Sequence, residues 1–499
     1  MRRILILAFL VTYGGFAFAK PIDEATAKTV GQNFLAFKLP YAPGDVTLSY
    51  KAYAPVSVLN TFTTQQPAVY IYIFSAGKNA FVMVSGDDRI TPILGYSNEG
   101  GFISKNMPGN VTYMLNTYTG EIDYAVKNNI SATKATTNQW TNLINNTISG
   151  AQPKSSTYVA PLLKELTWDQ QPYYNALCPY DYSVGEQTVT GCVATAMAQV
   201  MRFWKYPAKG TGYNSYTPYG YSAQTVNFAN VTYQWSDMPN ILTDTNNAVA
   251  TLMYDCGVAV DMRYGPPIYD GSGAWVITPN PDNTKFCAEN ALKTYFGYSS
   301  SLQGLQRSNY SDAKWVSLLQ ADISAGRPVI YSGFDPSNAG HCFVFDGYDI
   351  VNGNNYFHVN WGWSGMDDTY YVIDSLVPNA LGVGGGKGGG FGFNQAAVMG
   401  IQPPAITTTS GIQNISAAGN LVIYPNPAQN YTIADLTGFD GTPQLLTLIN
   451  TEGKIVYSAN IGTDKTNIRI NTENIPNGVY FVRILTDKGT LNSKLVVVQ

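Results

Sequence analysis

Apolar residues recur with two different periods along this chain. Helical spacing predicts four helices, at 22–37, 112–128, 193–204 and 311–325. Short apolar runs bounded by turn residues predict a hairpin at 68–84 and four further antiparallel strands, at 329–331, 342–345, 356–360 and 370–373. Helices followed by a run of antiparallel strands are typical of an α+β layout.

Changes in polarity along the chain predict its domains. A basic start, a short apolar run and Ala17-Phe18-Ala19 are typical of a secretory signal peptide. A polar stretch rich in Thr, Asn and Ser predicts an exposed linker, and a second linker begins at Pro403-Pro404. Beyond it, regularly spaced short strands predict a small all-β sandwich. The expected division is a signal peptide at 1–19, an N-terminal module at 20–150, a main domain at 158–403, a linker at 404–420 and the sandwich at 421–499.

Composition narrows the possible partners. Only 12% of the 499 residues are charged, and the net charge is −4 without a basic stripe, so we expect no nucleic acid partner. The N-terminal apolar run is too short for a membrane anchor, and no later stretch of sufficient length is free of polar residues. We therefore expect an exported protein, secreted or attached to the cell surface, with no membrane span.

Cysteine and histidine are scarce enough to limit the chemistry. The five cysteines are an odd number, so at least one thiol is expected to be free, while pairing of Cys256 with Cys287 stays open. The two histidines are His341 and His358, and His358 is expected to be structural because apolar residues bracket it. These residues lack the spacing of metal ligands, and we expect neither a metal nor another cofactor.

The stretch Thr190-Gly191-Cys192 precedes an apolar helix that ends before Pro207. The sulfur of Cys192 is therefore expected in the first helical turn, where free N–H groups and the positive end of the helix dipole favour a thiolate. The thiolate is the form of cysteine that attacks carbonyl groups. By itself, however, the pattern also fits a small buried apolar residue.

A thiol enzyme also needs an imidazole, a group that orients it and donors for the oxyanion. His341 follows Gly340 at the start of an apolar strand, and Asn360 stands beside Trp361 in a tryptophan-rich segment. Gln170 lies upstream of the cysteine. Each residue alone has a simpler structural explanation, but the chain order Gln, Cys, His, Asn is that of papain-like proteases.

Several of these segments resemble the streptopain family, papain-like cysteine peptidases that bacteria secrete. The resembling segments are 190–196, 198–199, 206–207, 257–258, 260–262, 264–266, 340–341 and 358–363. The segments 81–87 and 93–97 resemble the inhibitory propeptide of that family. The stretches 424–427 and 476–480 resemble the C-terminal sorting domain of the Bacteroidetes type IX secretion system.

The resemblance implies a papain-like catalytic domain, with a helical half and an antiparallel sheet half. The implied catalytic residues are Cys192 as nucleophile, His341 as proton acceptor and donor, Gln170 as oxyanion donor, and Asn360 and Trp361 beside the histidine. Gln171 is the alternative oxyanion donor, and whether the asparagine or the tryptophan orients His341 stays open. Ser272 and Gly340 are expected to border the substrate cleft. Residues 266–275 depart from the family pattern, so subsite preference does not carry over.

We therefore expect a secreted zymogen of a cysteine endopeptidase that hydrolyses peptide bonds in protein or peptide substrates. The N-terminal module would inhibit the enzyme until the linker near Lys154 is cut, and the C-terminal domain would engage the type IX secretion machinery. A glycine-rich run at 382–392 lacks the helix of a phosphate loop and is expected to cover the substrate. Two alternatives stay open: an inactive papain-like protein that binds at the cell surface, and an acyl-transfer enzyme, a transglutaminase or amidase, with the same residue pair.

Overall fold

The structure is a computed structural model, and it describes most of the residues that carry the predicted elements. The described residues are 20–39, 44–55, 67–105, 107, 109–148, 158–269, 271–278, 286–334, 340–373, 393–404, 421–437, 442–451, 455–461, 467–486 and 489–499. The expected signal peptide, the linker near Lys154 and the glycine-rich run at 382–392 lie outside them. The chain divides into two compact units, 1–405 and 406–499, which are described separately below.

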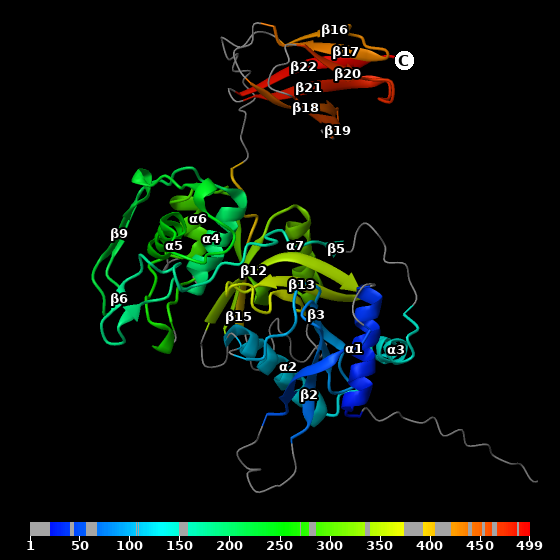
Figure 1. Cartoon of the computed structure of the whole chain (residues 1–499), viewed down its shortest axis with the longest axis vertical. Helices are drawn as coiled ribbons and strands as arrows, with labels where there is room; N and C mark the ends of the chain where they lie inside the picture. The colour runs from blue at the N-terminus through cyan, green and yellow to red at the C-terminus, as the bar shows by residue number, and fades with distance from the viewer. Residues whose placement is uncertain are drawn as a thin grey trace, which may run out of the picture. The chain divides into compact units, whose positions relative to one another are not determined.

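The first unit is organised around one antiparallel sheet (Figure 1). Within the described part of the chain its strand order is β1-β2-β3-β4-β14-β13-β12-β11-β15-β10, and β5 also pairs with β12. The bounds are β1 Thr47–Tyr53, β2 Val69–Ala76, β3 Ala80–Ser85, β4 Ile93–Ser97, β5 Tyr158–Val159, β10 Gln303–Gln306, β11 Val329–Phe334, β12 Gly340–Val351, β13 Asn354–Asn360, β14 Thr369–Val372 and β15 Phe393–Met399. The N-terminal module supplies β1 to β4, so the sheet is continuous across the module and the main domain.

Strands β4 and β14 join the two parts of this sheet. Tyr96 lies opposite Tyr370, and Gly95 lies opposite Tyr371. A Cβ atom on Gly95 would come within 2.9 Å of the Tyr370 carbonyl oxygen, so this close approach of the two backbones requires glycine. The rings of Tyr96 and Tyr370 stack with their centroids 5.2 Å apart. The N-terminal module is therefore held to the main domain by backbone pairing as well as by side-chain packing.

Three helices belong to the N-terminal module. Their bounds are α1 Glu24–Lys38, α2 Gly109–Lys127 and α3 Lys134–Ile144. Asp23 caps α1 by accepting the amide hydrogen of Thr26 at 2.8 Å. Helix α3 was not predicted, because its sequence is polar and offers few apolar positions. It is held instead by tertiary contacts, such as the bond of 2.8 Å that the Trp140 indole donates to the Ile90 carbonyl oxygen.

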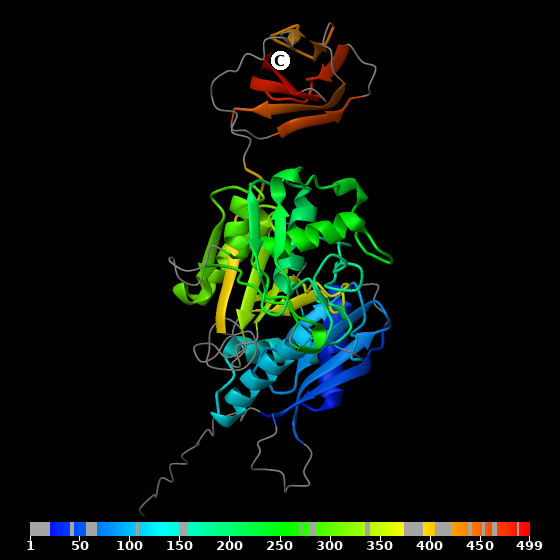
Figure 2. The same ribbon diagram turned by 90° about the vertical axis from the view of Figure 1, so that its left-hand side faces the viewer.

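The helical half of the main domain lies at the opposite end of this unit from the N-terminal module, green against blue in Figure 2. The helices are α4 Cys192–Trp204, α5 Asn247–Ala259, α6 Ala288–Thr294 and, on the sheet, α7 Asp312–Ser324. Short elements complete it: strand pairs β6 Tyr180–Asp181 with β7 Glu186–Gln187 and β8 Tyr213–Tyr216 with β9 Gln224–Asn227, and 3-10 turns η2 Phe228–Asn230, η3 Trp235–Asp237, η4 Pro267–Tyr269 and η5 Arg307–Asn309. Helix α4 packs between α5 and β12, which confirms the predicted α+β layout.

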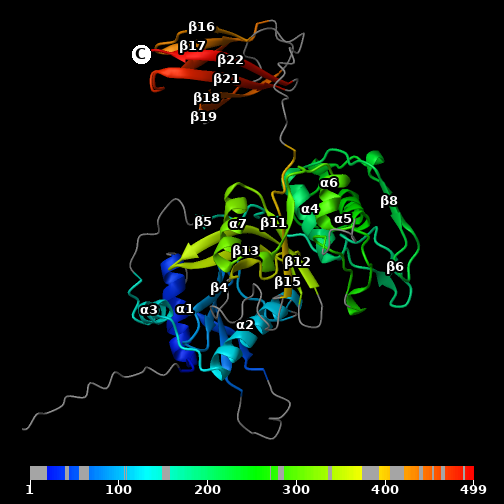
Figure 3. The ribbon, with the colours of Figure 1, turned by 180° about the vertical axis from the view of Figure 1, so that it is seen from behind.

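The second unit consists of two antiparallel sheets, as predicted (Figure 3). One has the order β16-β17-β20 and the other β19-β18-β21-β22. The bounds are β16 Val422–Tyr424, β17 Tyr431–Asp435, β18 Pro443–Asn450, β19 Ile455–Asn460, β20 Asn467–Asn471, β21 Gly478–Thr486 and β22 Gly489–Val497. Buried residues such as Leu446, Val482 and Leu495 form its core. Strand β17 was not predicted, because its apolar run is short.

Candidate active site

Helix α4 begins at Cys192, so the sulfur lies in the first helical turn, as predicted. Gly191 before it has φ 88°, and a Cβ atom there would lie 2.7 Å from the Met262 sulfur, so the turn into the helix requires glycine. The side chain of Cys192 is half-buried. Burial raises the pKa of this thiol, and hydrogen bonds from the backbone of Cys342, Val193 and Cys192 itself oppose the shift without cancelling it.

His341 is the second residue of β12 and lies opposite Gly333 of β11. Burial lowers the pKa of its imidazole to about 4, and a hydrogen bond with the backbone of Trp361 acts in the opposite direction. The centroid of its ring lies 6.3 Å from that of Trp361 and 6.4 Å from that of Trp363. In this form of the protein, therefore, both the imidazole and the Cys192 thiol are neutral at pH 7.

Cys192 and His341 line the same cavity, which has a volume of about 130 Å³. The cavity lies where the start of α4 meets the last residues of β11 and the first residues of β12. Its other walls include Arg263, Trp275, Phe334 and Gly340. The fold thus brings the candidate nucleophile and the candidate base, far apart in the sequence, to one cavity.

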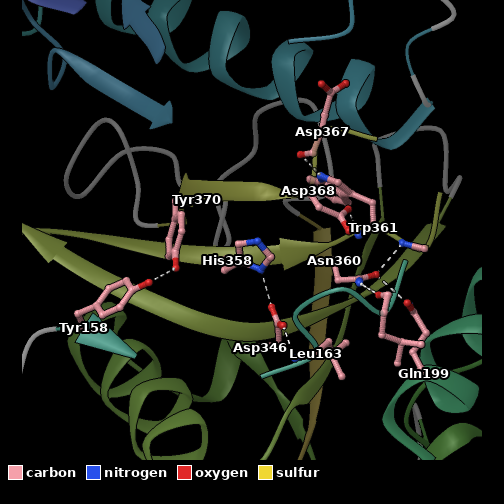
Figure 4. Close-up of polar contacts among 12 residues, drawn as sticks. Tyr158, Leu163, Gln199, Asp346, His358, Asn360, Trp361, Asp367, Asp368 and Tyr370 are labelled. Carbon is pink, nitrogen blue, oxygen red and sulfur yellow. Dashed lines mark hydrogen bonds and ion pairs between the residues drawn. The ribbon is translucent and has the colours of Figure 1, made fainter. Parts of the chain in front are cut away.

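Asn360, the last residue of β13, makes side-chain hydrogen bonds with Gln199 of α4 and with nearby backbone (Figure 4). Its Oδ1 atom accepts hydrogen bonds from Gln199 Nε2 at 2.9 Å and from the Gly362 amide at 3.1 Å. Its Nδ2 atom donates to the Leu166 carbonyl oxygen at 2.8 Å. Of the two residues considered beside the histidine, Trp361 is thus the one whose backbone meets the imidazole.

Gln170 is buried in a segment that is tied to both sides of the site. Its carbonyl oxygen accepts the amide hydrogen of Thr190, two residues before Cys192, at 3.3 Å. Asp169 accepts the Gln170 amide hydrogen at 2.6 Å and, through its other oxygen, the hydroxyl of Ser364 at 2.6 Å. These bonds place Gln170 between the approach to the nucleophile and the loop that follows Trp361.

Gly340 lines the cavity of Cys192 and His341, whereas Ser272 lines a neighbouring pocket that Gly340 also borders. Ser272 Oγ accepts the Gly265 amide hydrogen at 3.0 Å and donates to the Val189 carbonyl oxygen at 2.7 Å. Its Cβ atom would lie 3.2 Å from a Cβ added to Gly191, so it packs against the residue before the nucleophile. A Cβ atom on Gly340 would come within 2.7 Å of the Phe334 ring, which explains the need for glycine beside the histidine.

His358 lies elsewhere on the sheet and has a structural environment (Figure 4). Its Nδ1 atom pairs with Asp346 Oδ1 at 2.6 Å, and the other Asp346 oxygen accepts the Leu163 amide hydrogen at 2.9 Å. Burial lowers the pKa of His358, but the charge and hydrogen bond of Asp346 outweigh it, so the pKa is raised. This pair fixes the segment that enters the main domain against β12.

Three residues that support the site were not predicted: Gln199, Asp169 and Ser364. Gln199 was the easiest to find, because a polar amide on the apolar face of a helix needs a buried partner. Asp169 and Ser364 belong to loops distant in the sequence, so only the folded chain reveals their hydrogen bond.

All five cysteines are free thiols, so Cys256 and Cys287 do not form a disulfide. Cys342, beside the candidate base, is buried in the core of the helical half. Within the described residues, no three acidic, histidine or cysteine side chains are grouped to hold a metal ion. Among the helices of the described ranges, none is long and apolar enough to cross a membrane.

The presence of two histidines makes NMR titration a direct test of the lowered pKa that burial gives His341. In the Cys192→Ala precursor, we expect His341 to titrate near pH 4 and His358 above its ordinary value of 6.5. Because His341 has a lowered pKa, its contribution to precursor stability is complete above about pH 6.5 and is lost as the pH falls towards 4. A His358→Gln variant assigns the two signals, and a precursor His341 that titrates at 6.5 or higher would contradict the description.

Comparison with known proteins identifies three regions of the chain. Residues 168–371 match the peptidase C10 family, residues 19–122 match the Spi protease inhibitor, and residues 422–498 match a secretion system C-terminal sorting domain. Streptopain of Streptococcus pyogenes is 32% identical over 428 residues, which cover 80% of this chain and 98% of streptopain. The thiol protease/hemagglutinin PrtT of Porphyromonas gingivalis is 31% identical over 402 residues, covering 77% of this chain and 42% of PrtT.

A solved structure is also similar. A mutant fragment of Prevotella intermedia prointerpain A superimposes with a TM-score of 0.52 at 31% identity, covering 70% of this chain and 99% of the fragment. The likeness therefore extends over both the N-terminal module and the main domain, and it confirms the predicted papain-like fold.

Proposed function

The chain belongs to the peptidase C10 family of streptopain-like cysteine endopeptidases, and from this premise we propose that Cys192 and His341 form its catalytic pair. The match to a sorting domain identifies a secreted or cell-surface protein. The match to an inhibitor domain identifies a protease that carries its own propeptide. The observation that carries the proposal is the shared cavity, in which the helix-terminal thiol and the imidazole face one space.

In the proposed reaction, His341 takes the proton of Cys192, and the thiolate attacks the carbonyl carbon of the substrate peptide bond. The Gln170 side-chain amide and the backbone N–H of Cys192 hold the oxyanion that forms. His341 then protonates the leaving amine, and the peptide bond breaks to leave a thioester. A water molecule, deprotonated by His341, hydrolyses the thioester and restores the thiol.

The orientation of the base is assigned to the Trp361 backbone, which meets the His341 ring. Asn360 is assigned a positioning role one step removed. Its side chain bonds to Gln199 of α4 at 2.9 Å, so it ties the end of β13, directly before Trp361, to the helix that carries Cys192. The rings of Trp361 and Trp363 would keep water from the charged pair of the active enzyme.

The zymogen form is supported by the contacts of the N-terminal module with the main domain. Met114 and Tyr118 of α2 line a cavity together with Phe343 and Trp361, against which the His341 ring packs. Tyr118 also donates a hydrogen bond of 2.7 Å to the Val372 carbonyl oxygen of β14. The N-terminal module therefore contacts the aromatic side chains that surround His341. We propose that removal of the module lets His341 become charged.

Polar contacts also hold the N-terminal module against the main domain. Lys38 of α1 pairs with the buried Asp349 of β12 at 2.5 Å, and the Tyr96 hydroxyl bonds to the same carboxylate. Asp367 accepts the amide hydrogen of Ile103 at 3.1 Å. Because the module is also joined to the main domain by the chain itself, activation is proposed to require cleavage of the linker near Lys154 as well as the loss of these bonds.

The function is tested with the wild-type precursor alone. On incubation it should shorten by about the mass of the N-terminal module, and N-terminal sequencing should place the new end near Lys154. The matured enzyme should then convert casein into peptides whose new termini carry added water, as mass spectrometry reads directly. Cross-linked products would indicate a transglutaminase, and no reaction with casein or with the epoxide inhibitor E-64 would indicate an inactive binding protein.

A further inference from the structure

We propose that a tyrosine-lined groove beside the catalytic cavity binds an extended segment of the polypeptide substrate, with Arg263 selecting an acidic side chain where groove and cavity meet. This tyrosine groove has a volume of about 1040 Å³, and seven tyrosines line it: Tyr113 of the N-terminal module, the buried Tyr264, and five that define its walls. These five are Tyr180, Tyr182, Tyr219, Tyr221 and Tyr269. The inference rests on the proposed function, because it assigns the groove to the substrate of the Cys192 site.

The groove is continuous with the catalytic cavity. Arg263, Gly273 and Gly340 line both spaces, and Gly340 directly precedes the candidate base. Arg263 and Gly273 are joined by two backbone hydrogen bonds of 3.0 Å each, which fix the junction. A polypeptide with its scissile bond at Cys192 can therefore continue from the cavity into the groove without crossing other structure.

Three of the five wall tyrosines make contacts within the protein although they face solvent. Tyr180 and Tyr182 pack edge to face with centroids 5.0 Å apart at the start of the β6–β7 hairpin. The Tyr221 hydroxyl donates to Asp181 at 2.7 Å, and Asp181 also accepts the Ser183 amide hydrogen at 2.8 Å. The side chain of Tyr182 is 91% exposed, so it has no role in the core of this unit.

Such walls suit a particular chemistry of substrate. Tyrosine rings offer large, rigid contact surfaces at low entropic cost, and aromatic-lined grooves bind extended, proline-containing segments. Arg263 adds a cation, and none of the ion pairs within the described ranges uses it. A guanidinium at the junction favours a substrate carboxylate, which it can bind through two hydrogen bonds.

The inhibitor domain provides the second observation. Tyr113 of α2 lines the same groove, so in the precursor an aromatic residue of the module already lies against these walls. Removal of the module would therefore take this aromatic contact away from the groove. In the active enzyme, the substrate chain occupies the groove in place of Tyr113.

The test uses enzyme matured from the full chain and fluorogenic peptides with one shared scissile core. Extensions containing Asp, Pro and Tyr are placed on either side of the core, with Gly-Ser extensions of equal length for comparison. The extension lies on one side of the core in one peptide and on the other side in a second peptide. Of these two, the one that the wild type cleaves faster should have a kcat/KM about tenfold above that of its Gly-Ser counterpart, as expected for a few buried aromatic contacts. In the double variant Tyr182→Ser/Tyr219→Ser this ratio should fall to about one.

Two further variants make the test specific. Tyr213→Ser removes an exposed tyrosine of β8 outside the groove, and it should keep the tenfold ratio. Replacing Asp by Asn in the peptide extension should lower the kcat/KM of the wild type about fivefold. The same replacement should not change the kcat/KM of the Arg263→Gln variant.

The outcomes separate this inference from the proposed function. If the wild type cleaves neither peptide, the proposed function fails. If it cleaves extended and Gly-Ser peptides equally well, the groove does not bind substrate and only the inference is overturned. A matured enzyme that sediments as a dimer, which Tyr182→Ser/Tyr219→Ser dissociates, would assign the groove to a second copy and also overturn it.

Discussion

Replacing Cys192 by alanine should leave a folded chain that stays in its precursor form. We expect proteolytic activity to fall by at least about a thousandfold, because Cys342, the other thiol that lines the cavity, is buried in the core and burial raises its pKa well above the ordinary value. The thiol is half-buried at the start of α4, so its loss should change the unfolding midpoint little. Gel analysis of maturation over time and casein hydrolysis after incubation measure the effect.

Cys287→Ala is the matched control, because it removes another free thiol, fully buried at the start of α6. This variant should mature and cleave casein at close to the wild-type rate. Self-maturation and casein cleavage by the Cys192→Ala protein would exclude Cys192 as the nucleophile. Unfolding of Cys192→Ala under conditions where the control is stable would instead show that the thiol is structural.

Replacing Gln170 by alanine should lower kcat by about 10²–10³-fold and change KM little, because an oxyanion donor acts mainly in the transition state. The backbone bonds of this residue with Thr190 and Asp169 survive the change, since they involve main-chain atoms of Gln170. The fold of the segment should therefore persist. Steady-state kinetics on the matured enzyme, with reactive thiol counted by E-64 titration, provide the measurement.

Gln171→Ala is the neighbouring control and should retain near wild-type kcat. A large loss in Gln171→Ala combined with a small one in Gln170→Ala would move the oxyanion role to Gln171. Equal and small losses in both variants would assign the oxyanion to backbone donors alone. The pair of substitutions thus decides between two adjacent residues of the same type.

The sequence predicted the long, regular elements of the fold well. Helix α4, the hairpin of β2 and β3, and the strands β11 to β14 all carry strong apolar periodicity or clear turn residues. Helix α3 and strand β17 were missed because they have few apolar positions and are held by tertiary contacts. The strand pairing of β4 with β14 could not be predicted, because it joins segments far apart in the sequence through backbone atoms.

For the site, the sequence by itself determined which residues could act. With two histidines, five cysteines and one glycine-preceded helix start, the chain leaves few combinations for thiol chemistry, and their order matched one family. The tertiary structure alone decided how they are arranged. It turned Asn360 towards Gln199, brought the Trp361 backbone to His341, and lowered the pKa of that imidazole to about 4 by burial. The reason is physical: residue identity sets what a side chain can do, while burial and hydrogen-bond partners, which arise only on folding, set its charge and direction.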